Sequence, residues 1–358
     1  MTSNLAQNNS MSQEDEIGLV QLVKVLWQGK TWIVICSLIF SVIGIVYALT
    51  AQQWWTSSAK ITKGQYQNTA LIRNKLTNVY TIGSDKTIAE LNSIISEQEL
   101  LQAFVSKFNA YNNKVQFVLS NPLMQKYAKE NGLQSDEQQR NFAVQWSEKI
   151  SADIINDKKD VYKLTYQAKS STDSYQLLQS YIDFINQDVA NEVVYDLSAV
   201  VDNNKKMLST RLAFLESRAN QKIATEIKKT QYALDIAEAA GANSPIPLMD
   251  NNQLFAIDLG SKGLKEKESI LNKIKDLSMF EPEINVLKLN LQLLDQVNIS
   301  SAIKLQPVRF LQNADYPMSR DKPNRVGIVL FTLILGAIFG SASVIFRFLW
   351  KQEKQNLS

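Results

Sequence analysis

Residues 173–240 read DSYQLLQSYIDFINQDVANEVVYDLSAVVDNNKKMLSTRLAFLESRANQKIATEIKKTQYALDIAEAA, and these 68 residues contain neither Gly nor Pro. Gly241 and Pro245 follow at once, and both residue types commonly end a helix. The stretch therefore predicts one helix about 100 Å long, several times the width of a small domain. The alternative is two or three ordinary helices joined by loops that lack Gly and Pro.

A narrow apolar stripe follows one face of this stretch. The mean spacing of its residues is roughly 3.7, which is closer to the period of a straight helix than to the 3.5 residues of a coiled-coil repeat. A stripe this narrow covers one partner helix and not a globular core, so we expect a packing surface on a helix that projects from a base. The stripe consists of Val193, Leu197, Val201, Leu208, Leu212, Leu215, Ala219, Ile223, Ile227 and Leu234.

Two uncharged apolar runs, at 32–50 and 326–346, lie near the two ends of the chain. About 20 apolar residues cross the roughly 30 Å hydrocarbon core of a bilayer, so each run predicts a transmembrane helix. The alternatives are a pair of buried core helices and, for the first run, a cleaved signal peptide. An acidic segment at 14–16 precedes that run and no clear cleavage site follows it, which favours an uncleaved anchor.

An even number of spans places both termini on the same side of the membrane. Lysine and arginine counts beside the spans are nearly balanced, so they do not decide the orientation. Long loops are translocated largely regardless of charge, whereas short tails usually stay inside. We therefore expect both termini in the cytoplasm and the large loop outside.

The loop contains segments of both kinds of secondary structure. Apart from the long stretch, helices are expected at 85–108, 122–149, 261–277 and 282–296, the last two returning antiparallel after a turn within 241–260. Strands are expected at 55–62, 161–168 and 301–312. Because the strands gather near the membrane, we predict an α+β fold in which a membrane-proximal mixed α/β base carries a very long helical hairpin.

The residue types needed for most catalysis are missing. The chain has no histidine, and its single cysteine, Cys36, lies in the middle of the first apolar run. Neither G-x-S-x-G nor G-x-x-x-x-G-K-[ST] is present. A net charge of +3 with interspersed signs does not indicate nucleic-acid binding. The sequence therefore predicts no enzyme and no catalytic, cofactor-binding or metal-binding residues.

Small residues in the two apolar runs suggest helix contacts within the membrane. Gly336 and Gly340 form a GxxxG pair, a spacing that lets helix backbones approach closely in lipid, and Gly44 offers a matching shallow face. We expect the three glycines to take part in transmembrane assembly.

Lysine pairs at 205–206 and 228–229 are expected to lie on the solvated face of the long helix, with contact to anionic sugars as an alternative.

Four passages together resemble the Wzz-type polysaccharide co-polymerases, the chain-length determinants of bacterial O-antigen and capsule assembly. They are EIGL at 16–19 with LWQGK at 26–30, ALDIAEAAG at 233–241, LF at 254–255 with LGS at 259–261, and Pro317 with DKP at 321–323. The chain departs from the family where MSR at 318–320 replaces another proline and where Gly18 replaces a frequent acid. The resemblance adds Pro317 and Pro323 to the expected assembly residues.

The resemblance implies a non-catalytic inner-membrane regulator of the modal chain length of O-antigen or capsular polysaccharide. The implied partners are further copies of the chain in a ring-like homo-oligomer, a Wzy-type polymerase, lipid-linked polysaccharide and membrane lipids. Residues 347–358 are too few for the cytoplasmic kinase domain of longer family members. The competing interpretations are a two-span periplasmic sensor or chemoreceptor-like ectodomain, which needs a cytoplasmic output domain, and a periplasmic adaptor of an export system.

The resulting prediction divides the chain into seven parts. They are a cytoplasmic tail with an interfacial amphipathic helix (1–30), a first transmembrane helix (31–51), the N-terminal part of the periplasmic base (52–172), the protruding long helix and returning helices (173–297), a base strand with a proline-containing connector (298–325), a second transmembrane helix (326–346) and a cytoplasmic tail (347–358).

Overall fold

The computed structural model describes residues 19–156, 159–246, 254–299 and 305–356. Several expectations fall wholly or partly outside these ranges. The first is the start of the amphipathic N-terminal helix, together with residues 16–18 of the family-like passage EIGL. The others are the middle of the turn within 241–260 and the first residues of the strand expected at 301–312.

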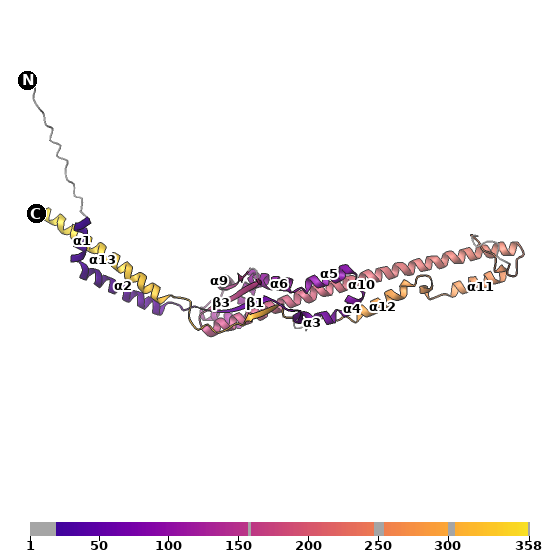
Figure 1. The fold of residues 1–358 in the computed structure, drawn as a ribbon, viewed down its shortest axis with the longest axis horizontal. Coiled ribbons are helices and arrows are strands. Elements are labelled where there is room, and N and C mark those ends of the chain that lie inside the picture. Colours follow the sequence, from indigo (N-terminus) through magenta and orange to yellow (C-terminus); the bar gives the residue numbers. More distant parts are fainter. Residues whose placement is uncertain (1–18, 157–158, 247–253, 300–304, 357–358) are drawn as a thin grey trace, which may run out of the picture.

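The molecule is strongly elongated (Figure 1). A pair of helices, α2 (Lys30–Thr50) and α13 (Arg325–Asn356), forms one end, the sheet-containing base follows, and the helix α10 (Ser171–Ala239) extends to the far end. Helices α11 (Gly260–Lys273) and α12 (Glu283–Asp295) return beside α10 toward the base. The predicted fold, a mixed base with a long helical hairpin and two apolar helices, is confirmed.

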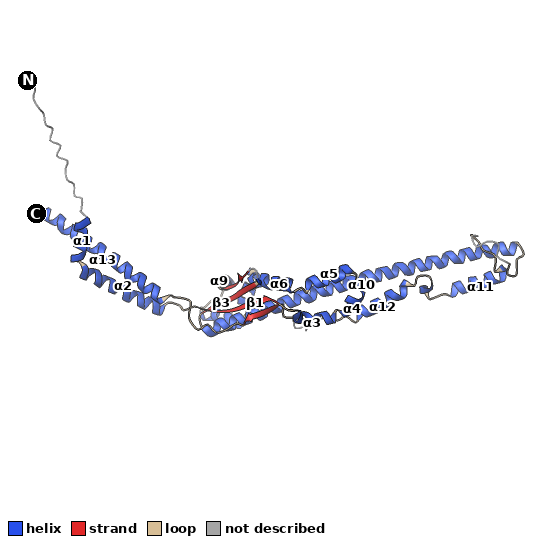
Figure 2. Ribbon diagram, in the orientation of Figure 1, coloured by secondary structure: helices blue, strands red, loops and turns tan. Residues whose placement is uncertain are grey.

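The base is built on one four-stranded antiparallel sheet of order β2-β3-β1-β4 (Figure 2). Three of its strands coincide with or lie within expected strands, whereas β2 was not foreseen. The strands are β1 (Trp55–Lys63), β2 (Ile150–Asn156), β3 (Val161–Ala168) and β4 (Val308–Gln312).

Side-chain alternation gives the sheet one buried and one polar face. Ala59 and Leu164 are register partners and both are fully buried. The next pair, Lys60 and Lys163, lies on the opposite face and is only half-buried. Because successive residues of a strand point to opposite faces, one face packs under helices while the other meets solvent.

The chain between β1 and β2 forms short helices, some packed against the sheet and others along the start of the hairpin. The helices expected at 85–108 and 122–149 are each interrupted, because Ser96 and Ser135 cap new helices by accepting hydrogen bonds from Glu99 N and Gln138 N, both at 3.2 Å. The helices are α3 (Tyr66–Lys75), α4 (Thr77–Ile82), α5 (Asp85–Ile94), α6 (Glu97–Asn109), α7 (Tyr111–Ser120), α8 (Pro122–Glu130) and α9 (Asp136–Ser147).

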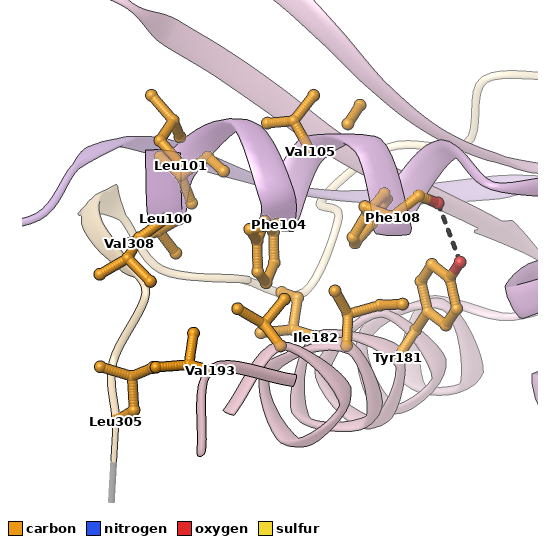
Figure 3. Packing of buried hydrophobic residues seen from close by; sticks show 14 of the residues in the cluster. Leu100, Leu101, Phe104, Val105, Phe108, Tyr181, Ile182, Val193, Leu305 and Val308 are labelled. Carbon is orange, nitrogen blue, oxygen red and sulfur yellow. Dashed lines mark hydrogen bonds between the residues drawn. The ribbon is translucent and has the colours of Figure 1, made fainter. Parts of the chain in front are cut away.

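The core of the base lies between α6, α10 and the buried face of the sheet (Figure 3). Phe104 and Phe108 of α6 face Ile182 and Tyr181 of α10, and all four side chains are fully or almost fully buried. The Tyr181 hydroxyl donates a hydrogen bond of 2.8 Å to the Phe108 carbonyl oxygen. This core fixes α10 to the base as far as Val201, nearly half of its length, and leaves the rest of the helix to project.

Helix α10 is continuous over 69 residues, so the alternative of two or three shorter helices is wrong. Ser170 caps its start by accepting a hydrogen bond from Asp173 N at 3.0 Å. At its end Gly241 takes the left-handed conformation (φ +71°), and Ala242 N donates to Ala237 O at 2.9 Å. This closing pattern satisfies the last helical carbonyls and explains why the helix ends where Gly appears.

The two helices α2 and α13 are long and apolar enough to cross a membrane. They pack side by side, and α1 (Leu19–Gln28) contacts α13 at the same end of the molecule. Their outward side chains, such as Leu38 and Ile338, are exposed in the isolated chain, as lipid-facing residues would be. Helix α13 continues to residue 356, past the end of the second apolar run.

Candidate functional sites in the hairpin and the paired spans

The proximal half of the apolar stripe joins α10 to the base and to α12. Leu197 lies in the core of the base, and Leu208 contacts both this core and the next cluster along the hairpin. In that second cluster Leu215 is fully buried against Ile284, and the half-buried Leu212 packs beside them. The stripe therefore has the returning helix α12 as its partner.

The distal half of the stripe is covered less completely. Ile223 is buried and Ile227 is half-buried. Near the tip, Leu234 packs against a third cluster that includes Ala237 and Leu264 of α11. The hairpin is thus held by small apolar clusters along its length.

Ion pairs connect α10 to the returning helices along the same path. Exposed pairs of this kind contribute about 0–1 kcal/mol each, so their main effect is to favour one register of the hairpin. Lys205, from one of the two lysine pairs expected to be solvated, forms one of these ion pairs. The pairs are Lys205–Asp295 (3.3 Å), Arg211–Glu283 (3.4 Å), Lys288–Glu216 (3.2 Å) and Lys267–Glu226 (2.6 Å).

Glu281 forms the most enclosed ion pair of the hairpin. It follows the short helix η2 (Leu277–Met279), at the point where the chain turns into α12, and its side chain is 7% exposed. Its carboxylate accepts hydrogen bonds from Arg218, including one from Nε at 2.6 Å, and Lys222 Nζ lies 2.7 Å away. These donors favour the charged form and lower the pKa of Glu281 to about 2. No local sequence signal pointed to this group.

We expect the hairpin to lose stability as the pH falls from about 4.5 to about 2. The unfolded carboxyl of Glu281 titrates near 4.5 and the folded one near 2, so the folded state binds fewer protons between these values. Circular dichroism melting curves at about pH 5 and about pH 3 measure the effect. The control is Glu281→Gln, which should show a smaller change in melting temperature between the two pH values. Equal changes in both proteins would contradict this assignment.

The GxxxG pair of α13 lies against α2 of the same chain. A Cβ atom added at Gly336 would lie 2.7 Å from Ser37 Cα, and one added at Gly340 would lie 2.9 Å from Ile33 Cα. Gly44 of α2 meets Thr332 of α13 in the same interface. Only Gly permits this approach of two backbones. The three glycines thus lie in one interface, which α2 and α13 form with each other. Assembly of separate chains through these glycines stays a hypothesis.

The lone cysteine offers a test of this pairing. Cys36 Cβ lies 3.2 Å from the Cβ atom that Gly340→Cys would introduce, close to the roughly 3.5–4.5 Å found in disulfides. We expect mild oxidation of this variant in detergent to consume both thiols within one chain, as counted by alkylation and intact mass. Ile338→Cys, on the exposed side of α13, serves as control and should keep both thiols. A Gly340→Cys protein that also keeps both thiols would refute the pairing.

The two prolines lie outside this interface, in the connector between β4 and α13. Pro317 O accepts a hydrogen bond of 2.9 Å from Ser171 Oγ at the start of α10. Pro323 follows Lys322, whose carbonyl oxygen accepts a hydrogen bond of 3.0 Å from Trp54 N. The connector is therefore fastened to the base, and the structure does not bring these prolines to the glycines in the spans.

Comparison with known proteins points to one family. Residues 15–108 match the family model described as "Wzz: Chain length determinant protein". The chain is 23% identical to the "Ferric enterobactin transport protein FepE" of Escherichia coli K12, over 96% of this chain and 92% of that protein. It is 24% identical to the "Chain length determinant protein" of Salmonella typhimurium, over 93% of this chain and 92% of that protein.

A solved structure shares the fold over nearly the whole chain. A structure described as "full-length bacterial polysaccharide co-polymerase" superposes with a TM-score of 0.66 at 19% sequence identity. The match covers 94% of this chain and 99% of that one. The base, the long hairpin and the two apolar helices are therefore one shared architecture.

Proposed function

We propose that this chain, which belongs to the Wzz chain length determinant family, is a non-catalytic regulator that sets the modal length of O-antigen or capsular polysaccharide. The observation that carries the proposal is the match to a chain length determinant protein across almost the whole of both chains. The shared fold includes the parts that this function uses, namely two membrane helices and a long hairpin.

The chain is held in the inner membrane by α2 and α13, and its large loop lies in the periplasm. In this arrangement residues 52–172 and 298–325 form the base next to the membrane, and 173–297 form the protrusion. Polymerisation of lipid-linked sugar units takes place at the membrane surface, so the base lies beside the growing end while the hairpin extends along the product. A protein in this position can regulate length without a catalytic residue of its own.

The regulator acts as a ring-like homo-oligomer. Several large apolar side chains stay exposed on the outside of the hairpin, among them Tyr195, Met207, Phe214 and Tyr232 of α10. Burial of these side chains between neighbouring copies is favourable, because it removes apolar surface from water. Multi-angle light scattering in mild detergent should give a mass several times that of one chain, and a monomer at all concentrations would contradict assembly.

A Wzy-type polymerase in the same membrane supplies the catalytic step. The lipid-exposed faces of α2 and α13 are available for contact with such an integral membrane protein. Purification of the tagged chain in mild detergent should retain the polymerase, as detected by mass spectrometry. A chain with scrambled apolar runs that still inserts in the membrane is the matched control for non-specific capture.

Deletion of the gene tests the regulatory function. The mutant should still make surface polysaccharide, because the polymerase remains, but its chain lengths should spread over a broad distribution. Restoring the gene on a plasmid should restore the modal peak. An unchanged banding pattern after deletion would refute the proposal.

A further inference from the structure

A hollow at the foot of the base lies next to the two membrane connectors. Trp54, which lines it, follows the last residue of α2 by four positions, a reach of at most about 14 Å. The backbone of Trp54 is bridged to the second connector, since Trp54 N donates to Lys322 O at 3.0 Å and Asp321 N donates to Trp54 O at 2.9 Å. Any molecule bound in this hollow is therefore close to the membrane surface.

Three aromatic side chains, Trp54, Phe142 and Trp146, form part of the wall of the hollow. Trp146 of α9 is almost fully buried, and its ring lies 5.8 Å from that of Trp54 and 5.7 Å from that of Phe142. The ring of Tyr127 packs 5.3 Å from Trp146 on a further side. Aromatic rings with a negative face and fixed orientation are suited to stack against a flat surface of C–H groups.

Amide side chains complete the hollow beside these rings. Asn141 and Gln145 are exposed one turn apart on α9, and both line the hollow, which has a volume of about 370 Å³. Each amide can donate and accept hydrogen bonds, as a ligand rich in hydroxyl groups requires. The neighbouring Gln138 accepts from Gln134 N and Ser135 N instead, so its role is to cap α9.

We propose that this hollow binds a saccharide, namely the sugars nearest the membrane in the lipid-linked polymer. A pyranose ring presents a C–H face to the half-buried rings of Trp54 and Phe142 and a rim of hydroxyl groups to the amides. The volume is within the roughly 300–1,000 Å³ of small-ligand sites. A phospholipid headgroup fits less well, because anionic headgroups are recognised by clusters of roughly 4–8 cations. Lys169 lines this hollow, and a second cation, Lys149, lies beside it with Nζ 5.0 Å from the centre of the Trp54 ring. The proposal rests on the regulatory function, which brings such a polymer to this surface.

The test uses the full chain in nanodiscs of phosphatidylcholine, so that phosphatidylglycerol is present only where it is added. The probe is the mixture of oligosaccharides that mild acid releases from the surface polysaccharide of the producing strain. Saturation-transfer NMR detects binding, and a titration of tryptophan fluorescence gives the dissociation constant. The double variant Asn141→Ala and Gln145→Ala removes two exposed amides from a helix without loss of helix propensity.

The double variant should bind about tenfold more weakly, since it loses two hydrogen bonds. The matched control is Asn112→Ala, which removes an exposed amide from a separate hollow on α7 and should bind like the wild type. A second variant, Trp54→Leu, removes one aromatic wall and should also weaken binding. Unchanged circular dichroism spectra show that the variants are folded.

Three results would overturn the proposal. They are no binding by the wild type, equal affinity of the double variant and the wild type, and displacement of the oligosaccharides by added phosphatidylglycerol, which assigns the hollow to lipid. Gene deletion separates this proposal from the regulatory function. If the wild-type gene restores the modal length but the protein binds no oligosaccharide, the saccharide site is wrong and the regulatory function stands.

Discussion

Leu215→Asp is expected to detach the first part of α12 from α10 and to abolish control of chain length. Leu215 is fully buried in the cluster that holds the middle of the hairpin, together with Ile284 and Leu287 of α12. The substitution removes a buried leucine and leaves an unpaired carboxylate in its place, with a combined cost of about 3–5 kcal/mol. Because this cluster is small and meets the core of the base through Leu208, the first part of α12 should open locally. The last turn of α12 should stay in place, since Leu294 is fully buried in the core of the base.

Hydrogen exchange with mass spectrometry measures this opening directly. Peptides from 277–290 should exchange faster in the variant, whereas peptides from β1 and β3 should exchange as in the wild type. Ala213→Asp introduces the same charge two residues away at an exposed position of α10, so it is the matched control and should leave α12 protected. Protection of α12 in the Leu215→Asp protein would show that this cluster does not hold the hairpin.

Gly336→Leu is expected to separate the two membrane helices. The first carbon of the new side chain would already lie 2.7 Å from Ser37 Cα and 2.9 Å from Phe40 Cβ, and a backbone atom cannot move aside as a flexible side chain can. The helices must therefore shift apart, which also disturbs the contact of Phe40 with Phe339, whose ring centroids lie 5.6 Å apart. In lipid, such close packing is the main attraction between helices.

The disulfide between Cys36 and Gly340→Cys reports this separation. Adding Gly336→Leu should reduce the yield of the intrachain disulfide about tenfold or more, which corresponds to a loss of roughly 1.4 kcal/mol in pairing. Ile338→Leu, on the exposed side of α13, should leave the yield unchanged. An undiminished yield with Gly336→Leu would mean that the spans do not meet through this glycine.

The longest elements were predictable because their causes are local. Helix α10 needs only the absence of Gly and Pro, a serine cap at its start and Gly241 at its end. The two spans need only length and apolar composition. Strands β1 and β3 were predictable because one of their faces is buried and the other is polar, which leaves a period of two in the sequence.

Shorter elements were missed for two different reasons. The break before α9 has a local signal, since Asn131 and Gly132 form a common turn pair and Gly132 takes φ +69°, so a single helix over 122–149 was an error of interpretation. Strand β2 lacks such a signal. Its outer half carries exposed Ile154 and Ile155, and only pairing with β3 makes it a strand.

The candidate sites depend on contacts between distant residues, which no local pattern contains. The glycines of α13 were recognisable as a contact surface, but their partner could have been another chain as readily as α2. Glu281 and Arg218 are 63 residues apart in the sequence. The hollow is lined by residues of α9 and by Trp54, which lies far before α9 in the sequence. Such groups become visible only when the fold brings them together.

The length distribution of surface polysaccharide tests the central claim, that the membrane-held hairpin sets chain length. The deletion strain is compared with strains that carry the wild-type gene, Leu215→Asp or Ala213→Asp at equal protein levels, and the polysaccharide is separated by gel electrophoresis. We expect the wild type and Ala213→Asp to restore a narrow modal peak and Leu215→Asp to leave the broad distribution of the deletion. The same distribution in all four strains would contradict the claim.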